Sequence, residues 1–146
     1  MIIRKADIND IDQLALLFNN YRIFYGKDSD VNGAQQFLTE RIVNADAVVF
    51  VAENEKLLKG FVQLYPLFSS TNMRRLWLLN DLFVVESQRG KGISVQLINC
   101  AKTLAKETES AGLMLETAKT NIIGNKLYPS TGFILDDQHN YYTWEP

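Results

Sequence analysis

The chain has 146 residues, 47% of them hydrophobic and 22% charged, which is typical of a globular protein. Its 15 basic and 17 acidic residues give a formal net charge of −2. This charge argues against a protein that binds nucleic acid over its whole surface. No run approaches the ~18 apolar residues of a membrane span. No apolar signal-peptide core follows the first charged residues. Cys100 is the single cysteine, so the chain cannot form an internal disulfide. We therefore expect one domain over residues 1–146, in the cytoplasm, without nucleic-acid or membrane partners.

The first half of the chain alternates between strand-like and helix-like apolar patterns. Asp7 or Asn9 is a suitable cap for a helix with apolar positions from Ile8 to Phe18. A polar break at residues 26–30 separates it from a second helix. We expect, in chain order, a strand, these two helices and a hairpin of two strands, over residues 2–5, 8–18, 34–42, 47–53 and 57–67.

The second half continues with alternating elements. An apolar strand over 76–85 precedes a helix with apolar positions from 93 to 105, and a strand over 113–117 precedes a helix over 121–128 that Pro129 should stop. Two strands follow, over 132–135 and 141–144, joined by a polar turn that contains the surface residue His139. The order β-α-α-β-β-β-α-β-α-β-β predicts a mixed α/β sheet with helices packed against it.

A glycine-rich turn, Arg89-Gly90-Lys91-Gly92-Ile93-Ser94, connects the strand 76–85 to its helix. Glycine lets backbone N–H groups approach an anion, and a helix N-terminus adds partial positive charge, so the turn is typical of a phosphate site. A Walker loop does not fit, because no glycine lies five positions before Gly90. A dinucleotide fingerprint does not fit either, because its third glycine would fall at Val95.

The turn resembles motif A of the GNAT superfamily of N-acetyltransferases, whose signature is Q/R-x-x-G-x-G/A. Arg89 and Gly92 match it, and Ser94 stands where the signature has glycine or alanine. The stretch 121–133, NIIGNKLYPSTGF, is similar to the family's N-x-x-A-x-x-L-Y-x-x-x-G-F, with Gly124 in place of alanine. The element order also matches over essentially the whole chain. The resemblance implies the GNAT acyl-CoA N-acyltransferase fold.

The resemblance also implies acetyl-CoA as co-substrate, and no metal. Backbone N–H groups of the glycine turn would hold the pyrophosphate, with charge-assisted contacts from Arg89 and Lys91; the alternative for both side chains is a solvated loop cation. Backbone groups of the preceding strand would bind the pantetheine arm. The implied acetyl-CoA residues are Phe83, Val84, Val85, Arg89, Gly90, Lys91, Gly92, Ile93, Ser94, Asn121 and Lys126.

Acetyl transfer to an amine needs an acid for the leaving thiolate and a route for the amine proton. By resemblance, Tyr128 is the general acid; the alternative is a packing aromatic. Asp81 is an unexpected charge in an apolar strand, which suggests a role in holding or deprotonating the substrate, or an ion pair with Arg74 or Arg75. Asn80 faces the opposite side if the strand is regular, and a bulge would change that.

The acceptor site is expected near the first helix. Tyr21 and Tyr25 lie one helical turn apart, and an aromatic face beside the acidic residues Asp28 and Asp30 suits an organic cation, although such spacing also occurs in cores. Asn80 and Asp81 are the other two expected acceptor-binding residues. By resemblance to the diamine and polyamine branch, we expect a small primary amine as acceptor. A protein amine is the enzymatic alternative, and a non-catalytic acyl-CoA sensor is the other. A homodimer is possible, with Tyr141, Tyr142 and Trp144 at an interface or packed within the monomer.

Overall fold

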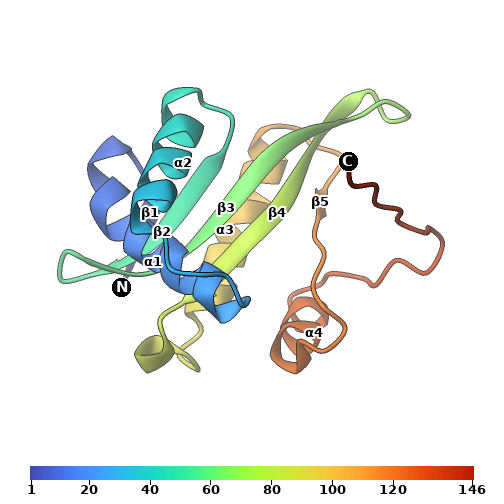
Figure 1. The fold of residues 1–146 in the computed structure, drawn as a ribbon. Helices are drawn as coiled ribbons and strands as arrows, with labels where there is room; N and C mark the ends of the chain where they lie inside the picture. The colour runs from blue at the N-terminus through green and yellow to red at the C-terminus, as the bar shows by residue number, and fades with distance from the viewer. The chain divides into compact units, whose positions relative to one another are not determined.

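The structure is a computed structural model that describes residues 1–146. The chain forms two compact units, Met1–Leu115 and Glu116–Pro146, which are described separately. The first unit contains the sheet and three of the four α-helices (Figure 1).

The sheet has five strands in the order β1-β2-β3-β4-β5. The first four pair antiparallel and β5 is parallel to β4, so the predicted mixed sheet is confirmed. The pairing of β5 with β4 ends at Met114, so β5 is shorter than the strand over 113–117 that the sequence predicts. The pairing stops there because β4 becomes irregular at its next residue, Leu79. The bounds are Ile2–Lys5, Val48–Asn54, Leu57–Ser69, Arg74–Val84 and Leu113–Met114.

The helices of the first unit begin at recognisable caps. The side chain of Asp7 accepts a hydrogen bond from Asn9 N–H and forms a capping box with Asp10, so Asp7 is the cap of the short 3-10 helix that leads into α1 (Ile11–Phe24). Asp30 accepts from Gly33 N–H, and α2 (Val31–Val43) therefore starts three residues before the predicted position. The third helix, α3, spans Ile93–Glu107.

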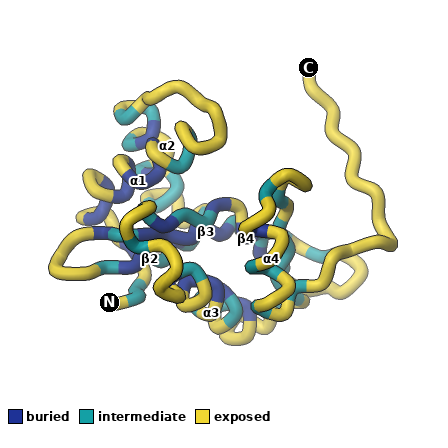
Figure 2. Tube along the Cα trace, turned by 90° about the horizontal axis from the view of Figure 1, so that it is seen from below, coloured by how far each residue is buried: buried dark blue, intermediate teal, exposed yellow.

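The two faces of the sheet are covered by different helices. Figure 2 shows α1 and α2 on one side of β2–β4 and α3 on the other. Leu14, Leu38 and Phe61 are fully buried in the core on the α1/α2 side, and Leu97 and Ile98 of α3 are fully buried on the other. Each such side chain stabilises the fold by about 1.5–3 kcal/mol. Phe61 pairs with Phe83 in β4, which places both on the α1/α2 side.

The second unit contains α4 (Ile122–Ser130). Asn121 caps it, and the prediction that Pro129 stops the helix is wrong by two residues, because Thr131 N–H donates to the carbonyls of Leu127 and Tyr128 and closes the last turn. The strands predicted over 132–135 and 141–144 are wrong as well: residues 132–146 contain no strand. A strand requires a hydrogen-bonding partner, and no backbone N–H of residues 134–146 donates to a backbone carbonyl of the chain.

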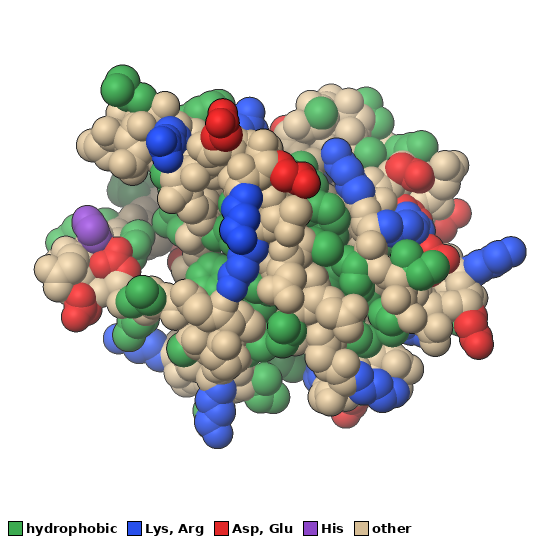
Figure 3. All heavy atoms as spheres, turned by 180° about the vertical axis from the view of Figure 1, so that it is seen from behind, with side chains coloured by type: hydrophobic (Ala, Val, Ile, Leu, Met, Phe, Trp, Pro, Cys, Tyr) green, Lys and Arg blue, Asp and Glu red, His purple; other side chains and the backbone are tan.

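Charged side chains of both signs are interspersed over the face shown in Figure 3. No helix combines the length and the apolar character that crossing a membrane requires.

Candidate active site

The glycine turn forms an open loop at the N-terminus of α3. Gly90 and Gly92 have φ of +74° and +78°, a conformation that strongly favours glycine. A Cβ atom built at either position would meet no atom of the protein within 4 Å. The glycines are therefore required by the backbone conformation, and their α-carbons face open space.

The backbone N–H groups of this loop are available to a ligand. Arg89 N–H donates to Glu86, and Gln96 N–H donates to Gly92 in the first bond of α3, but no N–H of residues 90–95 donates to another group of the chain. The cap residue Gly92 offers no side chain to satisfy them. Consecutive unused donors at the positive end of a 15-residue helix fit a diphosphate.

The side chains of Arg89 and Lys91 already have partners. Arg89 Nε donates to the carbonyl of Val84 over 2.9 Å, and its guanidinium lies 5.6 Å from the ring centres of Phe24 and of Phe83. It is thus bound to the end of β4, and the residue is also exposed. Lys91 Nζ donates to loop oxygens of Ser87 and Gln88 and is exposed. Their contacts with pyrophosphate stay predictions.

The end of β4 presents a free edge. Beyond Trp77 and Leu78, no strand pairs with β4 on the side of β5. Val85 N–H donates to Lys59 beside β3, so the N–H of Val84 points to the opposite, free edge. The Val84 N–H is thus available to an extended pantetheine arm. That Phe83, Val84 and Val85 bind this arm stays a prediction.

A β-bulge at Asn80 organises the middle of β4. Gln63 pairs with Asp81 and Leu64 with Leu79, so Asn80 is an extra residue and the regular alternation is broken. Asn80 is exposed, whereas Asp81 is only 4% exposed and lies on the α1/α2 side with Phe83.

Amide groups hold the Asp81 carboxylate. Gln63 Nε2 donates to Oδ2 over 2.8 Å, and Asn80 Nδ2 donates to Oδ1 over 3.1 Å. The alternative of an ion pair with Arg74 or Arg75 is wrong; the guanidinium of Arg75 instead lies over the rings of Phe68 and Trp77.

Gln63 is a site residue that the sequence analysis missed. Its side chain is fully buried, and its Oε1 has no hydrogen-bond partner in the chain. The sequence feature that could have identified it is a single polar residue within an otherwise apolar strand, Gly60-Phe61-Val62-Gln63-Leu64.

Aromatic side chains at the end of α1 and in β3 lie near this carboxylate. The rings of Tyr21 and Tyr25 meet edge-on at 4.9 Å, and Tyr21 OH reaches the carbonyl of Asn80 at 3.5 Å. Burial, and then the charge of Asp81, raise the pKa of Tyr25 and that of Tyr65. The structure therefore brings together the four predicted acceptor residues, Tyr21, Tyr25, Asn80 and Asp81.

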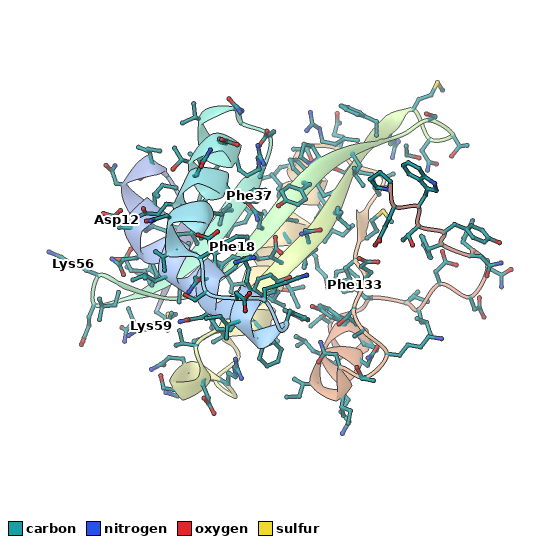
Figure 4. The ribbon with its side chains drawn as sticks, viewed as in Figure 1. Asp12, Phe18, Phe37, Lys56, Lys59 and Phe133 are labelled. Atoms are coloured by element: carbon teal, nitrogen blue, oxygen red, sulfur yellow. The ribbon has the colours of Figure 1, made fainter.

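The aromatic contacts continue toward α2. Phe18 stacks on Phe37 with ring centres 5.7 Å apart, and both are labelled in Figure 4. The ring of Phe18 also lies 6.1 Å from that of Tyr21. The tyrosines thus belong both to the predicted site and to the packing of α1.

A separate cavity of about 550 Å³ contains none of the predicted site residues. It is lined by Met73, Arg74, Arg75, Ala105, Lys106, Thr108, Glu109 and Ser110, between the start of β4 and the end of α3.

Comparison with known proteins decides the family. The model of the acetyltransferase (GNAT) domain matches residues 45–135. The chain belongs to the GNAT family.

Relatives of this GNAT enzyme cover nearly its full length. It is 41% identical to the N-acetyltransferase YhfO of Bacillus subtilis, over 97% of this chain and 95% of that protein. The crystal structure of a probable acetyltransferase superposes with a TM-score of 0.95 at 36% identity, covering 100% of this chain and 98% of the other. A predicted acetyltransferase of Clostridium acetobutylicum, solved with acetyl-CoA, shares the fold, with a TM-score of 0.80 at 20% identity, covering 97% and 95% of the two chains. The protein is therefore an acetyltransferase, and GNAT acetyltransferases use acetyl-CoA.

The GNAT motif of the second unit is built around the cap of α4. Asn121 accepts from Gly124 N–H and donates to Thr117. A Cβ at position 124 would lie 2.5 Å from Asn121 Nδ2, so an alanine there would require the Asn121 side chain to shift. Tyr128 packs edge-on against Phe133 at 5.8 Å, and Lys126 is exposed. The roles of Asn121, Lys126 and Tyr128 stay predictions.

Proposed function

We propose that the protein transfers the acetyl group of acetyl-CoA directly to a small primary amine of the diamine, polyamine or lysine-like type, within a ternary complex. The observation that carries this proposal is the buried Asp81, which has amide partners and no cationic one in the chain. A buried carboxylate without a counter-charge is unfavourable, and a protonated amine supplies that charge.

The groups around Asp81 suit an ammonium ion. A primary ammonium has three N–H donors, and the unpartnered Oε1 of Gln63 provides an acceptor next to the carboxylate. The rings of Tyr21 and Tyr25 favour a cation by cation–π attraction. An uncharged acceptor would supply neither the counter-charge for Asp81 nor the cation–π attraction.

The amine must lose a proton before it reacts. An alkyl amine of pKa ~10.4 is almost entirely protonated at pH 7, a handicap of roughly 4–5 kcal/mol. We assign to Asp81 the role of holding the amine and accepting its proton, directly or through water.

The acyl transfer itself forms a C–N bond and breaks the C–S bond of the thioester. The Val84 N–H, on the free edge of β4, would stabilise the oxyanion by about 2–4 kcal/mol. Tyr128 would donate its proton to the departing thiolate. The N–H groups of residues 90–95 would hold the diphosphate of the donor.

A panel of amines with detection of the released thiol tests the proposal. We expect turnover with diamines, polyamines or lysine and little with neutral alcohols. Asp81→Asn should abolish this turnover and retain acetyl-CoA binding, whereas Asp28→Asn, which alters an exposed carboxylate, should retain both.

Other results would overturn the acceptor class. Turnover with peptides alone would indicate a protein N-terminal or lysine acetyltransferase. Acetyl-CoA binding without turnover of any amine would indicate a sensor.

A further inference from the structure

The cavity of about 550 Å³ between the start of β4 and the end of α3 has no part in the proposed acetyl transfer. Its volume is within the range of roughly 300–1,000 Å³ that is typical of small-molecule sites. The 15 residues of α3 separate it from the glycine loop by roughly 22 Å, at about 1.5 Å per residue. The free edge of β4 does not reach it, because β5 pairs with Trp77 and Leu78 in between. A ligand of this cavity is therefore distinct from the acetyl donor.

Two arginines of this cavity lack an acceptor in the chain. Arg74 and Arg75 both line it, and neither side chain forms a hydrogen bond or an ion pair within the chain. The other four arginines all donate to oxygen atoms of the chain: Arg4, Arg22, Arg41 and Arg89. A guanidinium group carries several N–H donors in a fixed plane. The two arginines whose donors are unused within the chain thus belong to one cavity.

The guanidinium of Arg75 is held in position. It lies 5.2 Å from the ring centre of Trp77 and 5.5 Å from that of Phe68. Trp77 is only 4% exposed, and its Nε1 donates to Thr108 Oγ1 over 2.9 Å, so this ring is fixed. The loop after α3 is bound to the same strand, because Ala111 N–H donates to the carbonyl of Arg75 over 2.8 Å. These contacts use none of the guanidinium N–H groups, so Arg75 is positioned to bind an oxyanion.

The charge of the lining favours a divalent anion. Lys106, in the last turn of α3, is a third cation without an ion pair, and Glu109 is the one acidic residue of the lining. Three cations and one carboxylate give the lining a formal charge of +2, in a chain whose net charge is −2. A phosphate monoester carries about −1.5 to −2 at pH 7 and accepts charge-assisted hydrogen bonds from arginine. It therefore matches the cavity both in charge and in hydrogen bonding.

Two further groups of the lining are hydrogen-bond acceptors. The Thr108 hydroxyl donates to the carbonyl of Leu104 over 2.7 Å, so Ser110 Oγ is the donor in the 2.8 Å contact between the two hydroxyls. Ser110 Oγ therefore keeps its own acceptor sites. The carboxylate of Glu109 receives no hydrogen bond from the chain. Both groups suit hydroxyl groups of a ligand, and neither suits a second anionic group.

We propose that this cavity is a second small-molecule site and binds a sugar phosphate, a phosphate monoester that also carries hydroxyl groups. The phosphate contacts Arg74, Arg75 and Lys106, and the hydroxyl groups donate to Glu109 and Ser110. The site is independent of the acceptor proposed above, because neither Asp81 nor the glycine loop lines it.

Titration of ribose 5-phosphate into the isotope-labelled full chain, followed by the arginine Nε–H signals in NMR spectra, tests the site. CoA is present in excess, because the loop at residues 90–95 is itself expected to bind phosphate. We expect saturable shifts for Arg74 and Arg75 and none for Arg4 or Arg22, which have acceptors in the chain. Ribose, and sodium chloride at equal ionic strength, should shift none of these signals. The two cavity arginines report on this site whether or not the protein acetylates an amine.

Charge-matched variants separate a built site from general attraction of anions. Arg74→Gln/Arg75→Gln should weaken binding of ribose 5-phosphate by at least roughly tenfold in calorimetry. The control Lys5→Gln/Lys56→Gln removes the same charge at two exposed lysines and should keep the affinity of the wild type. Circular dichroism in the far ultraviolet should be the same for all of these proteins. Arg74→Gln alone, at an exposed residue, should also weaken binding and leaves the contact of Arg75 with Trp77 intact.

Four results would contradict the proposal. Absence of saturable shifts at Arg74 and Arg75 would overturn it. An equal loss of affinity in the lysine control would show attraction to the general surface charge, and displacement of the probe by CoA would show that the two share one site. Inorganic phosphate that binds as tightly as ribose 5-phosphate would overturn the assignment of a sugar phosphate.

Discussion

Gln63 and Asp81 are opposite residues of β3 and β4, and Gln63 Nε2 donates to Asp81 Oδ2 over 2.8 Å while Gln63 Oε1 remains without a partner. The pair thus combines a buried carboxylate with a buried, unused acceptor. Since leaving such an acceptor unsatisfied costs about 1–3 kcal/mol, a ligand that donates to it gains that amount.

Replacing Gln63 by leucine should weaken binding of the amine acceptor. The variant keeps a similar volume but removes the acceptor and one donor to Asp81, so the KM for the amine should rise roughly tenfold to a hundredfold. Steady-state kinetics should show an unchanged KM for acetyl-CoA. Gln36→Leu, at an exposed position of α2, serves as control. An unchanged KM for the amine would remove Gln63 from the acceptor site.

Replacing Gly92 by valine should abolish binding of CoA. A valine at φ +78° is strained, and its side chain would project into the space beside the unused N–H groups. Gly26 is a matched control, because its φ is +82° and its surroundings are equally open. Both variants should lose similar stability, but only Gly26→Val should still be stabilised by acetyl-CoA, by about 2.7 kcal/mol at 100 times its Kd. Normal CoA affinity in Gly92→Val would contradict the phosphate site.

Replacing Tyr128 by phenylalanine should lower kcat by about 10²–10⁴-fold, the range for loss of a general acid. Affinity for acetyl-CoA, measured by calorimetry, should change little. Tyr142→Phe removes a hydroxyl from an exposed ring and should leave kcat unchanged. Unchanged turnover in Tyr128→Phe would exclude it as the acid.

The ion-pair network at the start of the chain should make stability depend on acid pH. Both guanidinium N–H₂ groups of Arg4 donate to Asp10, over 2.7 and 2.8 Å, and this hydrogen bonding lowers the pKa of Asp10 below its ordinary value of 3.8. Because the folded-state pKa is the lower one, this stabilisation is complete above pH ~4 and is lost as the pH falls through the folded-state pKa.

Asp10→Asn should therefore cost about 1–3 kcal/mol at neutral pH and flatten the loss of stability in acid. Urea unfolding at a series of pH values measures both effects. The control Asp12→Asn, at an exposed carboxylate, should keep the acid dependence of the wild type. An equal acid dependence in Asp10→Asn would show that other carboxylates cause it.

Local patterns were sufficient to predict the glycine loop, the helices and the five strands of the sheet. The loop at residues 89–94 depends on glycine spacing and on a helix that starts immediately after it, and both are visible in neighbouring residues. The role of Gln63 was not predictable in this way, since it depends on the register between β3 and β4, which joins residues far apart in the chain. The prediction of strands over 132–135 and 141–144 was wrong for a related reason. Strand propensity is a local property, but a strand forms only where a second strand pairs with it.

The extra residue in β4 has a consequence for access to the thioester. If Asn80 were deleted, Leu79 and Asp81 would keep their present sides of the sheet, because their partners Leu64 and Gln63 are already adjacent. The strand would straighten, and we expect β4 and β5 to continue their pairing beyond Leu78 and Met114. That pairing would cover the edge where the Val84 N–H now points outward. The extra residue thus costs a few backbone hydrogen bonds between β4 and β5, and it keeps the edge of β4 accessible to the thioester.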